Sequence, residues 1–99
     1  MRRRAESSAI MAGAIAALRV LAMRSAPTVL VNGVATGFID AADGAPDRAM
    51  LSHVPLSRAG SAEEAANAVL FLLDPLNSYT VGQVLAVDGG WTAGYGRDF

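Results

Sequence analysis

Two short apolar runs flank a helical segment, and this arrangement constrains the fold more than any other feature of the sequence. The first run contains Val29, Leu30 and Val31, with Val34 close behind, and the second is VLAV at residues 84–87. Short apolar runs without alternation are typical of parallel strands, which are covered on both faces. Each run is followed by turn residues that include glycine. The sequence therefore predicts an α/β fold with two parallel strands.

The segment between the two runs has the signature of a capped helix. Ser61 and Glu64 form a capping box, in which the serine hydroxyl accepts a hydrogen bond from the amide of Glu64 while the Glu64 carboxylate reaches back. Asp74 and Pro75 end the helix, which is predicted over residues 61–74. Its apolar side chains form a stripe expected to pack against the sheet: Ala65, Ala68, Val69, Phe71, Leu72 and Leu73. Strand, helix and strand together form a right-handed βαβ unit.

A further helix is predicted over residues 7–26, before the first apolar run. Its apolar side chains recur at spacings of three and four: Ile10, Met11, Ala14, Ile15, Leu18, Leu21 and Ala22. An alternative is a secretory signal segment, because arginines precede the apolar run 9–18 and small residues follow at 25–26. Arg19 and Arg24 interrupt the apolar stretch and argue against both a signal and a membrane span. We therefore expect a cytoplasmic protein that does not associate with membranes.

The length of 99 residues allows one domain with a single core. Two parallel strands leave an apolar sheet edge open, so the domain is expected to be incomplete and to seek another strand. The predicted single incomplete domain, 1–99, consists of a helix at 7–26, a strand and turn at 28–37, a loop with a short helix at 38–60, a helix at 61–74, a strand at 82–90 and a tail at 91–99.

Composition excludes several classes of site. The chain contains no cysteine, no lysine and one histidine, His53, so disulfides, thiolate nucleophiles, lysine Schiff bases and cysteine- or histidine-rich metal sites are excluded, and no metal ligands are predicted. The formal net charge is −1, and three of the basic residues cluster at 2–4. No basic face is expected to track a phosphate backbone, so nucleic acid is not a predicted partner.

Three blocks of residues together resemble a known family. They read VNGVATGFI at 31–39, PLSRAGSAEE at 55–64 and GQVLAVDGG at 82–90. In order and spacing they resemble the C-terminal part of short-chain dehydrogenases/reductases, closest to the 3-oxoacyl-carrier-protein reductase type, over about residues 7–92. The resemblance implies a partial Rossmann fold, namely the C-terminal part of a doubly wound parallel sheet, and NAD or NADP as cofactor.

The resemblance also implies a cofactor-binding segment and subunit contacts. Thr36, Gly37, Phe38 and Ile39 would face the nicotinamide carboxamide through backbone groups. Thr36 replaces the family's proline, and Ala41 stands where the family usually has a hydroxyl residue. In the family, the helix corresponding to residues 7–23 and the strand corresponding to residues 84–88 contribute to subunit contacts, so the resemblance implies a homo- or hetero-oligomer with a reductase of the same family.

The catalytic motifs of the family are not matched. The family's Tyr-xxx-Lys pair falls on Ser7 and Met11, and no TGxxxGxG phosphate loop occurs in these 99 residues. A serine without a neighbouring cation is too weak an acid to replace a phenol, and a thioether carries no charge. No catalytic residue is therefore predicted, and whether the chain is an enzyme stays open. The expected function is a truncated or degenerate reductase without independent activity. The alternatives are a noncatalytic partner subunit of a full-length reductase and a small secreted protein.

Overall fold

The computed structural model describes residues 2–40 and 46–94, with side chains from residue 5 onward. It contains helices and two parallel strands, which confirms the predicted α/β class. The elements are, in order, α1 (Arg2–Ser25), β1 (Gly33–Thr36), α2 (Arg48–Leu51), α3 (Ala62–Leu73), the 3-10 turn η1 (Pro75–Asn77), β2 (Val84–Val87) and α4 (Trp91–Gly94). Two compact units result. One runs up to Gly33 and includes Asp74–Val84, and the other comprises Val34–Leu73 and the chain from Leu85 on.

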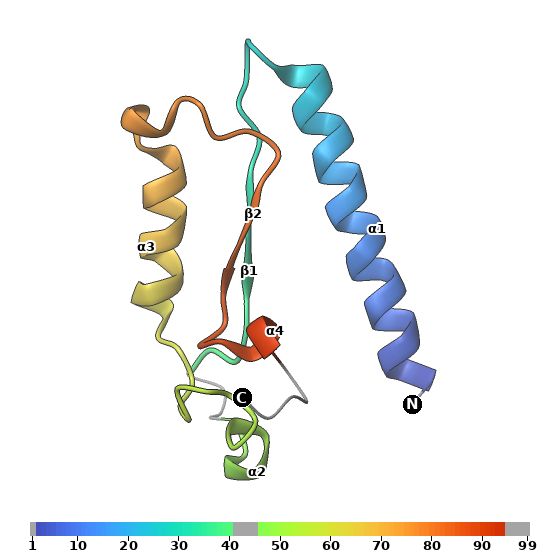
Figure 1. Ribbon diagram of the computed structural model, residues 1–99, viewed down its shortest axis with the longest axis vertical. Coiled ribbons are helices and arrows are strands. Elements are labelled where there is room, and N and C mark those ends of the chain that lie inside the picture. Colours follow the sequence, from blue (N-terminus) through green and yellow to red (C-terminus); the bar gives the residue numbers. More distant parts are fainter. Residues whose placement is uncertain (1, 41–45, 95–99) are drawn as a thin grey trace. The chain divides into compact units, whose positions relative to one another are not determined.

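Strands β1 and β2 lie side by side in a two-stranded sheet (Figure 1). The amide of Gly33 donates to the carbonyl of Gln83 at 2.8 Å where the pair begins, and the amide of Gly37 donates to the carbonyl of Val87 at 3.0 Å where it ends. β1 is shorter than the predicted segment 28–37. Val29 and Leu30 lie outside it and are exposed, and the amide of Val29 still donates to the carbonyl of Ser25 in the turn that leaves α1.

The first unit is built on α1, which begins at Arg2 rather than at the predicted residue 7. Ala22 is 1% exposed, and Leu18 on the same face lies against Gly33. Only this narrow part of the predicted apolar stripe is covered, since Ile10, Met11 and Leu21 are exposed. Among the described helices, α1 alone is long and apolar enough, over Ala5–Ser25, to cross a membrane. A signal segment has the same length and composition, so the secretory alternative is retained.

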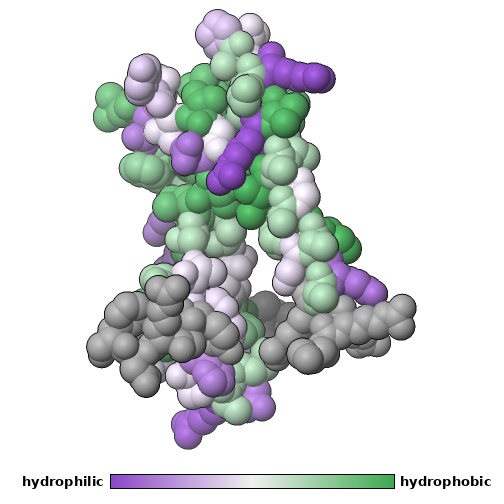
Figure 2. Space-filling view, turned by 45° about the vertical axis from the view of Figure 1, so that its right-hand side comes forward, coloured by the Kyte–Doolittle hydropathy of each residue, from purple (hydrophilic) through white to green (hydrophobic). Residues whose placement is uncertain are grey.

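The second unit carries α3, which begins at the predicted capping box. Ala68 is buried, and Ala65 and Leu72 on the same side are half-buried. The wider stripe predicted for this helix is wrong within the described chain, because Val69, Phe71 and Leu73 are exposed. Two short strands offer too little surface to cover more than one row of side chains on a helix. Many large apolar side chains therefore reach the surface (Figure 2).

The remaining segments are short. Asp47 caps α2, which lies in the loop predicted to contain a short helix. The predicted tail begins with α4, and its residues 95–99 lie outside the described residues, as does Ala41.

Candidate functional site

The carboxyl ends of the two parallel strands meet within the second unit. A Cβ atom on Gly37 would lie 2.9 Å from both the Cα and the Cβ of Asp88, a distance that only glycine permits. The hydrogen bond from Gly37 to Val87 closes the same contact. The segments 36–39 and 88–90 are therefore in direct contact. In parallel α/β sheets this edge is where ligands bind.

Residues 36–39, the predicted cofactor-binding segment, are held by a parallel bridge between Ile39 and Gly60. Gly60 donates to the carbonyl of Phe38 at 2.8 Å, and Asp40 donates to the carbonyl of Gly60 at 2.8 Å. In a parallel bridge the flanking residues supply the hydrogen bonds, so the amide and carbonyl of Ile39 itself point away from Gly60. Thr36 is exposed, whereas Gly37, Phe38 and Ile39 are half-buried.

The turn after β2 is organised by the carboxylate of Asp88. Its Oδ1 accepts the amide of Gly90 at 3.0 Å, and its Oδ2 accepts both the amide of Thr92 at 3.2 Å and the Thr92 hydroxyl at 2.7 Å. The hydrogen bond from the Thr92 hydroxyl is the main reason why the pKa of Asp88 lies below its ordinary value. Asp88 thereby caps the start of α4.

The two glycines of this turn permit close packing that side chains would block. Gly89 and Gly90 have φ values of 65° and 96°, which favour glycine. A Cβ on Gly89 would lie 2.7 Å from the Cγ1 of Val54, and one on Gly90 would lie 2.9 Å from the Cγ of Pro55. The amide of Leu56 donates to the carbonyl of Gly89 at 3.2 Å. The loop 54–56 is thus fastened to the strand-end turn.

An aromatic pair joins the two strand ends. The rings of Phe38 and Trp91 have centroids 5.0 Å apart at an interplanar angle of 80°, and the His53 ring lies 6.4 Å from Trp91 on a similar edge arrangement. Aromatic pairs favour such T-shaped geometry. The sequence pattern places Trp91 in the tail and does not predict this contact, since the two residues lie far apart along the chain.

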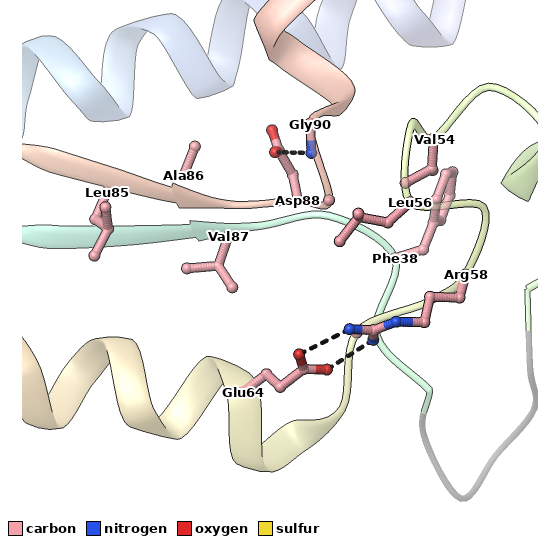
Figure 3. Close-up of a pocket in the computed structure, with 12 residues that line it drawn as sticks. Phe38, Val54, Leu56, Arg58, Glu64, Leu85, Ala86, Val87, Asp88 and Gly90 are labelled. Atoms are coloured by element: carbon pink, nitrogen blue, oxygen red, sulfur yellow. Dashed lines mark hydrogen bonds and ion pairs between the residues drawn. The ribbon is translucent and has the colours of Figure 1, made fainter.

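A cavity of about 270 Å³ opens beside these residues (Figure 3). Most of its wall is apolar, and the buried side chain of Val54 is 3% exposed. Of the predicted cofactor-binding residues, only Phe38 reaches it. The cavity is lined by Phe38, Val54, Leu56, Arg58, Gly60, Glu64, Leu85, Ala86, Val87, Asp88, Gly89 and Gly90.

One polar pair lines the cavity at the start of α3. Arg58 donates to both oxygens of Glu64, at 2.9 Å and 3.1 Å, and Glu64 also accepts the amide of Ser61 at 3.0 Å. The hydrogen bond from Arg58 is the largest cause of a pKa of Glu64 lowered to about 2. The capping box is confirmed, because the Glu64 amide donates to the Ser61 hydroxyl at 3.1 Å. The sequence pattern did not predict the ion pair of Arg58 with Glu64. The spacing of six residues between the two was the available signal.

The described side chains contain no group of three or more histidine, cysteine, aspartate or glutamate residues that could hold a metal ion. The strand ends offer backbone amides and carbonyls, the Asp88 carboxylate, the Arg58–Glu64 pair and an apolar cavity.

Comparisons with known proteins find relatives along most of the chain. Residues 3–92 match the family described as Enoyl-(Acyl carrier protein) reductase. A 3-oxoacyl-(acyl-carrier-protein) reductase FabG of Aquifex aeolicus is 45% identical over 89 residues, covering 80% of this chain and 34% of that protein. A 7alpha-hydroxysteroid dehydrogenase of Escherichia coli K12 is 41% identical over 68 residues, covering 63% of this chain and 27% of that protein.

The fold is also found among solved structures. An NADPH-bound short chain oxidoreductase from Pseudomonas aeruginosa PAO1, described as containing an atypical catalytic center, superposes with a TM-score of 0.74 at 37% identity. The match covers 86% of this chain and 38% of that one. The matches to two curated 3-oxoacyl-(acyl-carrier-protein) reductases cover 34% and 27% of their lengths, so the chain spans well under two thirds of these relatives.

Proposed function

The chain belongs to the short-chain dehydrogenase/reductase family, and from this premise we propose that it forms the C-terminal part of an NAD(P)-dependent reductase domain. Residues 36–39 border the nicotinamide end of the cofactor in this proposal. The observation that carries it is the pairing of Ile39 with Gly60, which directs the Ile39 amide and carbonyl outward at the carboxyl end of β1.

The backbone at this position fits the group it would hold. A nicotinamide carboxamide has one carbonyl acceptor and two N–H donors, and Ile39 presents one backbone donor and one backbone acceptor. Gly37 adds close contact between strand ends without a side chain in the way. When bound, the nicotinamide would exchange a hydride with the substrate. The role of this chain is to orient that ring.

The proposed family chemistry is hydride transfer between NAD(P)H and a carbonyl or alcohol. A 3-oxoacyl group is the leading substrate class, because the Aquifex relative is named for it. Ser7 and Met11 cannot supply the proton donor and the cation of the family's pair, and the chain holds no lysine. We propose that these 99 residues are a truncated or degenerate reductase without independent activity. Catalysis would need the rest of such a domain.

Two measurements on the purified chain test this proposal. Titration with NADPH or NADH, followed by amide chemical shifts, should perturb residues 36–39 weakly, and the amide of Gly13 in α1 serves as the unaffected control. Oxidation of NADPH with a 3-oxoacyl thioester should stay at the rate without protein. Turnover would overturn the proposed lack of activity. Shifts confined to other residues would overturn the proposed cofactor segment.

A second candidate is a noncatalytic subunit that pairs with a full-length reductase of the same family. The exposed apolar side chains of α3 support it, since large apolar patches commonly mark association sites. Co-expression with such a reductase should yield a complex that co-elutes, and separate elution at micromolar concentration would argue against it.

We also propose that the protein is cytoplasmic. Sequencing the amino terminus of the natural protein tests this location, because a secreted form would lose α1 and begin near Pro27. Retention of the residues of α1 is the expected result.

A further inference from the structure

The side chain of Asp88 stands at the centre of contacts that reach both strand ends. Its two carboxylate oxygens bind the amides of Gly90 and Thr92, the residues on either side of Trp91. The amide of Trp91 donates to the backbone carbonyl of Asp88 at 3.2 Å. Three successive amides thus converge on one residue, which fixes the direction in which the Trp91 side chain leaves the backbone.

Trp91 in turn contacts the predicted cofactor segment, residues 36–39. Its ring meets the Phe38 ring with centroids 5.0 Å apart, and Phe38 lies between Gly37 and Ile39. Phe38 also forms part of the cavity wall and shares it with Asp88 (Figure 3). Gly37 packs directly on the Asp88 backbone, so the strand ends touch at two places.

We propose that Asp88 is a positioning residue: by capping α4 it holds Trp91 against Phe38 and so fixes residues 36–39 at the carboxyl end of β1. The consequence for cofactor orientation rests on the proposed function. The mechanical coupling from Asp88 to residues 36–39 is independent of the proposed function, because it can be measured without any cofactor.

The chain supplies its own reporter, because Trp91 is its only tryptophan. In Asp88→Asn the side-chain amide group cannot replace both oxygens as acceptors, so the emission of Trp91 should move to longer wavelength and its quenching by acrylamide should rise by about twofold. Hydrogen exchange of the amides at 37–40 should accelerate in the same variant. Asp74→Asn is the matched control, because Asp74 caps η1 by accepting the amide of Leu76 at 2.9 Å and takes no part in the Phe38–Trp91 pair.

Variants of Thr92 separate positioning from general destabilisation. Thr92→Val removes the hydroxyl that donates to Asp88 at 2.7 Å, whereas Thr92→Ser keeps it. Thr92→Val should reproduce part of the Asp88→Asn change in fluorescence and exchange, and Thr92→Ser should retain the original signals. These variants keep the carboxylate, so they stay informative if Asp88→Asn does not fold.

Unchanged Trp91 emission together with unchanged exchange at 37–40 in folded Asp88→Asn or Thr92→Val would overturn the positioning role. Changed emission with unchanged exchange would overturn the link to residues 36–39. A result that overturns the link between Asp88 and residues 36–39 does not affect the proposal that these residues bind the cofactor. The NADPH titration of the unsubstituted chain tests that proposal separately.

Discussion

At the scale of single residues, acidic side chains close local hydrogen bonds at the starts of helices and turns. Asp47, Asp74 and Asp88 each accept a backbone amide two residues further on, and Glu64 accepts the amide of Ser61. Such contacts satisfy amides that have no partner inside the helix. Because they connect near neighbours in the chain, they follow from residue type and spacing.

Removing the hydroxyl that caps α3 should destabilise the protein. Ser61→Ala leaves the Glu64 amide without its acceptor, so the free energy of unfolding should fall by about 1 kcal/mol in urea denaturation. Ser8→Ala, inside α1 and exposed, is the control and should change stability little. Equal effects of the two substitutions would contradict the capping role.

Acid should weaken the start of α3. The folded pKa of Glu64 is lowered to about 2 from an ordinary value of 4.5, chiefly by the hydrogen bond from Arg58. The unfolded chain therefore binds the proton first, so the stabilisation is present above pH 4.5 and is lost as the pH falls toward about 2. The lowered pKa of Asp88 acts in the same direction. Urea midpoints at about pH 6 and about pH 3 should differ less in Glu64→Gln than in the original chain. An unchanged difference would contradict the assignment.

At the scale of elements, the sheet depends on a close approach that only glycine allows. Where β1 ends, Gly37 lies against the backbone of Asp88. Where β1 begins, a Cβ on Gly33 would meet the end of the Leu18 side chain at 2.7 Å, a flexible neighbour that can move. The two ends of the strand therefore differ in how they tolerate a methyl group.

Gly37→Ala should separate the strand ends, because the atoms it would meet belong to the backbone and Cβ of Asp88. We expect a loss of about 1–3 kcal/mol in the free energy of unfolding. Gly13→Ala is the control: nothing lies within 4 Å of the added methyl, and alanine favours the helix, so the free energy of unfolding should rise by up to about 1 kcal/mol. Thermal unfolding followed by circular dichroism measures both, and a neutral Gly37→Ala would show that the contact is not tight.

At the scale of the whole molecule, the described chain exposes far more large apolar side chains than it buries. Its buried apolar residues are Ala22, Val54 and Ala68, whereas the exposed ones on α3 include Phe71 at 55% and Leu73 at 71%. A folded monomer rarely leaves such side chains uncovered together. The Aquifex relative is more than twice as long as this chain, which supports the view that further protein surface covers them.

The purified chain should therefore self-associate. Replacing Phe71 and Leu73 together by glutamine should raise the dissociation constant by about tenfold, because apolar contact area is lost. Sedimentation at several protein concentrations measures the shift. Ala66→Gln, at an exposed position of the same helix, is the control and should leave the constant unchanged. A monomeric original chain would contradict the prediction.

The sequence by itself determined the local features of this protein and its family. The capping box at Ser61 depends only on residue type and spacing. The α/β class followed from two apolar runs on either side of a helix, and the three motif blocks pointed to the short-chain dehydrogenase/reductase family. The extent of burial was overestimated for Val69, Phe71 and Leu73, because an apolar stripe states what a helix can bury and not how much surface is present to cover it.

Only the tertiary structure decided which distant residues meet. The pairing of Ile39 with Gly60 and the contact of Phe38 with Trp91 join segments separated by many residues. Hydrogen bonds between near neighbours are limited by chain geometry to a few partners, whereas a contact across the chain depends on how strands, turns and loops pack together. The strand-end site is therefore a property of the folded chain, built on turns that the sequence already encodes.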